Sequence, residues 1–295
     1  MVLSSIGYSL AAAFGWGISD YAAARLSSKM GYFRTAFLTT AISCVFIPVL
    51  CVPYFGLIVQ FPEASLAAVG LGFVSIVAVL SSYKSFEIGK LSIVSPIQSS
   101  FPALSTALAI IFLDETLTAL RTLGILVILG GIVIVTMQAN GDKLPETREN
   151  LEANQRQGIG YALITFASYG FMLFALKFVV SYLGPLIPVL ILQLVMASIL
   201  AIIFVTLKPK SKANTRNSGT LGPILVVAIF NILAGLAYNF GIIGGQVAVV
   251  STIAGLYSVV IVLLARAYLK KRMTIRQGVC VTAIVLGVAI LGFTG

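Results

Sequence analysis

The sequence has no histidine, and charged residues make up only 9% of its 295 residues. Without histidine, the chain lacks the commonest proton shuttle, metal ligand and catalytic base. Soluble domains are about 25% charged, so this chain has too little polar surface to cover a globule in water. Because 59% of the residues are hydrophobic, we expect most side chains to be solvated by lipid.

Chemical motifs are also missing. Cys44, Cys51 and Cys280 fall in apolar stretches, and their spacing gives neither a disulfide framework nor a CxxC metal pattern. The sequence contains no Walker motif, no paired carboxylates and no nucleophile with an adjacent base. We therefore expect no metal, no cofactor and no enzymatic activity. The net charge of +10 lies in short segments between apolar runs, which argues against nucleic acid as a partner.

Ten apolar stretches are long enough to cross a membrane. A hydrocarbon core of about 30 Å needs about 20 apolar residues in a helix, and stretches of this length are too long to be barrel strands. The first stretch lacks a basic leader, so it is expected to remain as a helix. The predicted spans are residues 6–24, 32–52, 65–83, 91–112, 119–137, 158–178, 185–207, 221–243, 246–267 and 275–293.

An internal repeat divides the chain into two halves. The segment Gly7-Tyr8-Ser9-Leu10 with Trp16-Gly17 recurs 153 residues later, and residues 95–131 align with 251–287 at an offset of 156. The polar stretch 138–157 then forms a linker between halves 1–137 and 158–295. With five spans each, the second half is inverted relative to the first, as in many secondary transporters. Chance similarity between apolar sequences is the alternative.

The basic residues are distributed unevenly between the connections. Of the 19 lysines and arginines, all but Arg121 and Lys177 lie in the first, third, fifth, seventh and ninth connections. Because lysine and arginine favour the cytoplasmic side, both termini are predicted to be non-cytoplasmic in a multi-pass protein of the plasma membrane.

The junction between the fourth and fifth predicted helices carries a family resemblance. From Pro96 it reads PIQSSFPALSTALAIIFLDETLTALRTLGILVILGGIVIV, with a Leu-x-Glu-x-Leu-Thr turn before a glycine-rich helix. With the Gly15-Trp16-Gly17 turn, this resembles the ten-helix EamA-type members of the drug/metabolite transporter superfamily. The second half has a weaker copy in which Lys271 stands opposite Glu115.

The resemblance implies a fold and a site. It implies a central pocket lined by the first, third, fourth, sixth, eighth and ninth helices, and cytoplasmic termini, which the charge bias contradicts. We retain the orientation predicted by the charge bias. Placing the polar and aromatic residues of this chain in that pocket gives Trp16, Tyr83, Ser95, Gln98, Ser99, Tyr169, Asn231, Tyr238, Asn239, Tyr257 and Ser258. Ordinary hydrogen bonding between helices is the alternative for each of them.

Of the nine acidic residues, seven are assigned to the predicted connections, which leaves Asp20 and Glu87. Asp20 is four residues after Trp16, on the same helical face. It is a candidate for substrate binding and for a proton or cation site, or it pairs with Arg25 or Lys29 at a helix end. Glu87 is the second coupling candidate, and Lys84 is a candidate for substrate recognition. A surface pair between them is the alternative.

Pro96 and Pro102 are expected to kink the fourth helix beside the pocket and are candidates for gating. Together these features predict a secondary transporter that moves a small amphipathic metabolite, such as an amino acid or amine, by alternating access around a midplane pocket. Its partners would be this substrate, membrane lipid and, where transport is coupled, protons. A flippase of lipids or lipid headgroups is the alternative, with the basic connections attracting anionic lipid.

Overall fold

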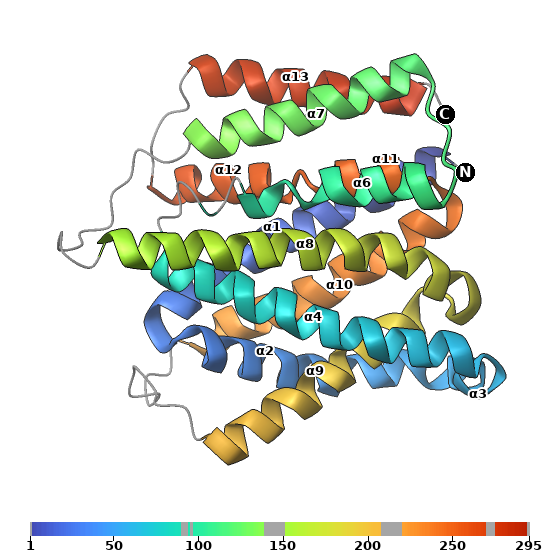
Figure 1. Cartoon of the computed structure of the whole chain (residues 1–295), viewed down its shortest axis with the longest axis vertical. Helices are drawn as coiled ribbons and strands as arrows, with labels where there is room; N and C mark the ends of the chain where they lie inside the picture. The colour runs from blue at the N-terminus through green and yellow to red at the C-terminus, as the bar shows by residue number, and fades with distance from the viewer. Residues whose placement is uncertain are drawn as a thin grey trace.

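The computed structural model describes residues 2–89, 94, 97–138, 151–207, 220–269 and 275–293. Within this part of the chain every regular element is a helix and none is a strand, as the composition predicts. The main helices are α1 (Val2–Met30), α2 (Tyr32–Cys51), α4 (Pro62–Ile88), α6 (Phe101–Phe112), α7 (Ala119–Gln138), α8 (Leu151–Leu183), α9 (Leu186–Leu207), α10 (Leu221–Gly244), α11 (Val247–Ala254), α12 (Tyr257–Leu269) and α13 (Ile275–Phe293) (Figure 1). The short η1 (Val52–Tyr54) and α3 (Gly56–Gln60) join α2 to α4.

Six segments of the described chain are long and apolar enough to cross a membrane. They are Tyr32–Tyr54, Pro62–Ile88, Gln155–Leu183, Leu186–Thr206, Leu221–Gly244 and Val247–Leu264, and Ile97–Phe112 and Ala119–Ile134 are shorter apolar helices. The all-helical membrane architecture is therefore confirmed, whereas this set is smaller than the ten spans predicted. Helix α1 is not in the set, and its Ser5, Ser9, Ser19 and Ser27 side chains are buried.

Several helix bounds differ from the predicted ones. Helix α8 begins at Leu151, inside the stretch predicted as a linker. The predicted ninth helix is broken at Gly255 into α11 and α12, where a Cβ would lie 2.5 Å from Pro102 Cγ. Pro102 itself stands at the first turn of α6, where a missing backbone N–H costs nothing. Proline and glycine thus meet at two helix breaks, one in each half.

The same close contact occurs twice in the bundle. A Cβ added at Gly17 in α1 would lie 2.5 Å from Val260 Cβ in α12, and one at Gly170 in α8 would lie 2.8 Å from Leu104 Cβ in α6. Gly17 and Gly170 are repeat partners at the offset of 153, and Leu104 and Val260 are partners at 156. The first helix of each half therefore packs against the fourth helix of the other, which chance similarity of sequence does not explain.

The helix ends fall into two groups. Helix α1 begins and α13 ends at one end of the bundle, here called the terminal end (Figure 1). Helices α1 and α4 end and α8 begins at the opposite end, here called the basic end, where the chain carries Lys29, Arg34 and Lys84. Helices α1 and α8, the first of each half, run in opposite directions.

Candidate substrate site

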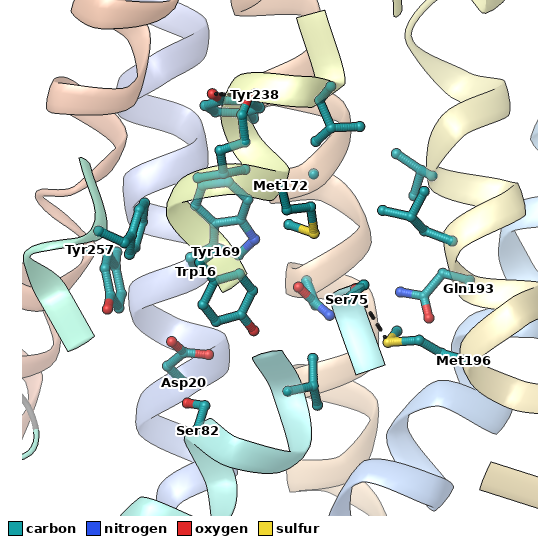
Figure 2. Close-up of a pocket in the computed structure, with 18 of the residues that line it drawn as sticks. Trp16, Asp20, Ser75, Ser82, Tyr169, Met172, Gln193, Met196, Tyr238 and Tyr257 are labelled. Carbon is teal, nitrogen blue, oxygen red and sulfur yellow. Dashed lines mark hydrogen bonds between the residues drawn. The ribbon is translucent and has the colours of Figure 1, made fainter. Parts of the chain in front are cut away.

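A pocket lies at the centre of the bundle, between helices of both halves (Figure 2). Helices α1, α4, α6, α8, α9, α10 and α12 contribute to it, together with the turn before α6. Its lining residues are Trp16, Asp20, Ser75, Val79, Ser82, Tyr83, Gln98, Phe101, Tyr169, Met172, Leu173, Leu176, Val189, Leu192, Gln193, Met196, Asn231, Gly235, Tyr238, Asn239 and Tyr257. The repeat partners Trp16 and Tyr169 both lie in this lining, and so do Phe101 and Tyr257.

Asp20 is the only acidic residue among the described lining residues, and none of them is lysine or arginine. Its carboxylate lies beside the Tyr169 and Ser82 side chains in Figure 2. Within the described part of the chain, no ion pair or hydrogen bond reaches this carboxylate. Arg25, one of its predicted partners, instead lies 5.7 Å from the ring centroid of Tyr21. The geometry thus favours a role for Asp20 in the pocket over a surface ion pair.

Aromatic rings form much of the pocket wall. The Trp16 and Tyr238 ring centroids are 5.6 Å apart, and Phe101 lies 5.9 Å from Tyr169 and 5.6 Å from Tyr257. Such offset and tilted arrangements are the favourable ones for aromatic pairs. The rings therefore support one another and hold a defined shape around Asp20.

Several predicted pocket residues also bond to their neighbours. Gln98 accepts a hydrogen bond from Ser82 Oγ at 2.8 Å and donates to Ser85 Oγ. Tyr238 donates to the Leu173 carbonyl at 3.0 Å, and Asn239 Nδ2 donates to the Pro185 carbonyl at 2.8 Å. These bonds fix the orientation of the side chains and reduce their capacity to bind a solute.

Gln193 of α9 was not predicted as a site residue. Its side chain lines the pocket at 5% exposure, and its Oε1 atom is buried without a hydrogen-bond partner in the described structure. The resemblance did not place the seventh predicted helix at the pocket. A lone glutamine within a strongly apolar helix was the available signal, because such a group is costly to bury unpaired.

Replacing Gln193 by methionine tests whether this amide serves a solute. We expect thermal stability without ligand to stay within about 1 kcal/mol of wild type, since an unpaired buried amide is replaced by an apolar group of similar shape. Solute affinity should fall by up to about tenfold, the worth of one hydrogen bond. The matched control is Gln246→Met, because both Oε1 and Nε2 of the Gln246 amide form hydrogen bonds. That variant should lose stability, and equal behaviour of the two would contradict the assignment.

Other predicted site residues lie outside the pocket. Lys84 pairs with Glu87 at 3.8 Å and lies 4.7 Å from the Tyr32 ring centroid, and Glu87 accepts a bond from the Tyr32 backbone N–H at 3.4 Å. Ser99 and Ser258 are buried but do not line the pocket. Pro102 contacts Gly255 instead, and Ser95, Pro96 and Lys271 lie outside the described residues.

The Leu-x-Glu-x-Leu-Thr turn of the first half forms hydrogen bonds to the second half at the terminal end. Glu115 accepts hydrogen bonds from the backbone N–H groups of Val247 at 2.6 Å and Ala248 at 2.9 Å. These are the first two residues of α11 in the second half. Arg121 donates to Gln246 Oε1 at 2.9 Å, and Gln246 Nε2 donates to the Thr116 carbonyl at 3.1 Å. A carboxylate at a helix N-terminus is favourable on both hydrogen-bonding and dipole grounds.

Glu115→Ala is expected to lower the free energy of unfolding by about 1–2 kcal/mol, because two charge-assisted bonds to a helix N-terminus are lost. Thermal unfolding in detergent measures this. The neighbouring Asp114 is the control, since it is exposed and has φ of 50°. Asp114→Asn keeps a residue that tolerates this conformation and should unfold as wild type does. An equal loss in both variants would contradict the capping role.

Comparison with known proteins identifies the chain. The model of the EamA-like transporter family matches residues 3–137 and again residues 156–293. The chain belongs to this family. The EamA match supports the predicted resemblance and gives one family unit in each half of the bundle. EamA proteins are membrane transporters of small solutes and not enzymes, in agreement with the lack of catalytic groups in the sequence.

Two further comparisons concern relatives and fold. The chain is 40% identical over 62 residues, 21% of its length, to an uncharacterized protein, MJ1333.1, of Methanocaldococcus jannaschii, and the match spans 45% of that protein. A crystal structure described only as that of a protein aligns with 97% of this chain and is itself covered to 96%. Its TM-score is 0.77 at 15% identity. This similarity supports the fold of the EamA protein and carries no information on its substrate.

Proposed function

We propose that this EamA protein is a secondary transporter that moves a small amphipathic solute by alternating access. The observation that carries the proposal is a pocket lined by repeat partners, Trp16 with Tyr169 and Phe101 with Tyr257. A pocket bounded by equivalent elements of two halves can open to either side when the halves exchange their conformations.

The proposal includes a topology of ten spans arranged as two inverted five-helix halves. The opposite directions of α1 and α8 support the inversion (Figure 1). In this topology α6 with the turn before it forms the fourth span, and α11 with α12 forms the ninth. Both are broken near the pocket, where Gly255 meets Pro102.

Counterflow in proteoliposomes tests the proposed transport. Vesicles loaded with an excess of unlabelled solute should accumulate a labelled trace of the same solute faster than unloaded vesicles, because the carrier returns loaded. A panel of amines, amino acids, sugars and nucleobases serves as probes. Scrambling of labelled lipid without movement of any soluble solute would indicate a flippase and overturn the proposal.

We place the protein in the plasma membrane, with both termini on the non-cytoplasmic side. This orientation rests on the concentration of lysine and arginine in the first, third, fifth, seventh and ninth predicted connections. Alkaline phosphatase, which is active only outside the bacterial cytoplasm, should be active when fused after Gly295. A fusion after Lys143, in the polar connection between the halves, should be inactive. The reverse pattern would contradict the predicted orientation.

A further inference from the structure

Resting on the proposed transport function, we infer that the solute is an organic monocation with an apolar body, such as a protonated amine or a quaternary ammonium compound. The pocket holds one carboxylate among aromatic rings, and the described lining contains no basic side chain. This arrangement distinguishes a cation from a zwitterionic amino acid or a neutral solute.

The charge of the described pocket lining favours a positively charged solute. Asp20 contributes a carboxylate to the described lining, and no lysine or arginine there offsets it. A buried charge is costly unless it is paired, so a positively charged solute would complete the site. The carboxylate of a zwitterion, by contrast, would find no basic side chain among the described lining residues.

Basic side chains of α1, α4 and α8 have partners other than Asp20. Lys84 pairs with Glu87 at 3.8 Å. Lys177 donates to the carbonyl oxygens of Ile242 and, at 3.4 Å, Gly245 at the end of α10. Arg25 lies over the Tyr21 ring and donates to the Tyr21 hydroxyl at 3.5 Å. Each of these cations therefore has a partner away from the Asp20 carboxylate.

The surroundings of Asp20 suit an organic cation rather than a metal ion. Trp16, Tyr169 and Tyr257 stand around the carboxylate in Figure 2, and their ring faces attract cations. The described residues contain no group of three or more His, Cys, Asp or Glu that could hold a metal. Met172 and Met196 add polarizable apolar surface on the side toward α9. The lining thus offers one anionic contact and an adaptable apolar wall.

Three probes with the same phenylethyl frame separate the alternatives. They are 2-phenylethylamine, a cation at neutral pH; 2-phenylethanol, which is neutral; and phenylalanine, a zwitterion. Ligand-induced shifts in thermal unfolding of the full chain in detergent give relative affinities. We expect the amine to bind at least about tenfold more tightly than either analogue, the scale of one cation–π contact together with an ion pair.

Asp20→Asn supplies the second measurement. In this variant the preference for the amine over the alcohol should fall to nearly one, while Glu63→Gln, at an exposed acid in the first turn of α4, should keep it. If Asp20→Asn does not fold, the comparison of the three probes on the wild-type protein still decides. Equal or tighter binding of phenylalanine or 2-phenylethanol, or no response to any probe, overturns the inference.

The inference and the proposed function fail in different ways. Counterflow of phenylalanine without counterflow of the amine would overturn the inference and leave the transporter proposal standing. Tight amine binding with no counterflow of any solute would overturn the transport function and leave the cation site standing.

Discussion

Asp20→Asn is expected to lower solute uptake driven by a proton gradient strongly, while the variant folds as wild type does. A carboxylate that faces the pocket can alternate between a protonated form and a form paired with solute, and an amide cannot take up the proton. The structure places Asp20 in the pocket lining beside Tyr169. We expect gradient-driven flux to fall by about a hundredfold, the scale of a buried charged contact of 2–3 kcal/mol.

The measurement is uptake into proteoliposomes with an imposed pH gradient, compared with uptake at equal pH. Glu87→Gln is the matched control, since Glu87 is also an acid of the membrane region but bonds to Lys84 and to the Tyr32 backbone outside the pocket. It should retain coupling with some loss of stability. Undiminished gradient-driven uptake in Asp20→Asn would remove Asp20 from the coupling mechanism.

Gly17→Ala is expected to lower the free energy of unfolding by about 1–3 kcal/mol, the usual cost of overpacking. The added methyl group would lie 2.5 Å from Val260 Cβ and 2.9 Å from the Tyr257 backbone carbonyl oxygen. The backbone atom cannot move aside as the end of a flexible side chain can, so α1 and α12 must separate. Because Trp16 and Tyr257 both line the pocket, transport should also fall.

Gly7 of the same helix is the control. A Cβ there would meet nothing within 4 Å, and alanine is favoured over glycine in helices by up to about 1 kcal/mol. Gly7→Ala should therefore be as stable as wild type or more stable. The repeat offers a second pair, Gly170→Ala with Gly160→Ala as its control. Equal stability of Gly17→Ala and Gly7→Ala would contradict the proposed close packing of α1 on α12.

Much of the fold could be predicted because lipid imposes simple rules. Low charge and long apolar stretches require helices, and the repeat predicted two related halves. Helix breaks were harder to predict. The sequence around Gly255 carries no charge, and Pro102 of the other half packs closely against the break. Such a contact between distant segments leaves no local pattern in the sequence.

Part of the candidate site could also be predicted. Trp16, Tyr83, Gln98, Tyr169, Asn231, Tyr238, Asn239 and Tyr257 were placed in a pocket through the resemblance, and all of them line the pocket in the structure together with Asp20. Residues near the predicted ends of spans were harder to place. Glu87 lies at 7% side-chain exposure and contacts the first turn of α2 rather than the pocket. Hydropathy gives depth in the membrane but not the direction in which a side chain points.

The role of Glu115 shows a further limit of the sequence. Its turn was part of the family resemblance, but the sequence did not indicate what the carboxylate contacts. The structure places it on the N-terminus of α11, 132 residues away in sequence at Val247. Pairing across the two halves depends on tertiary arrangement, and a single sequence carries no direct record of it.

Access to the pocket from the two sides of the membrane tests alternating access most directly. Val79 lines the pocket and is close to cysteine in size, so Val79→Cys introduces a thiol probe there. The native Cys44, Cys51 and Cys280 are first replaced by alanine. In sealed proteoliposomes a membrane-impermeant thiol reagent is added to one side or the other. We predict that Cys at this position reacts from each side in turn and that transported solute slows both reactions. Reaction from one side alone during active transport would contradict alternating access.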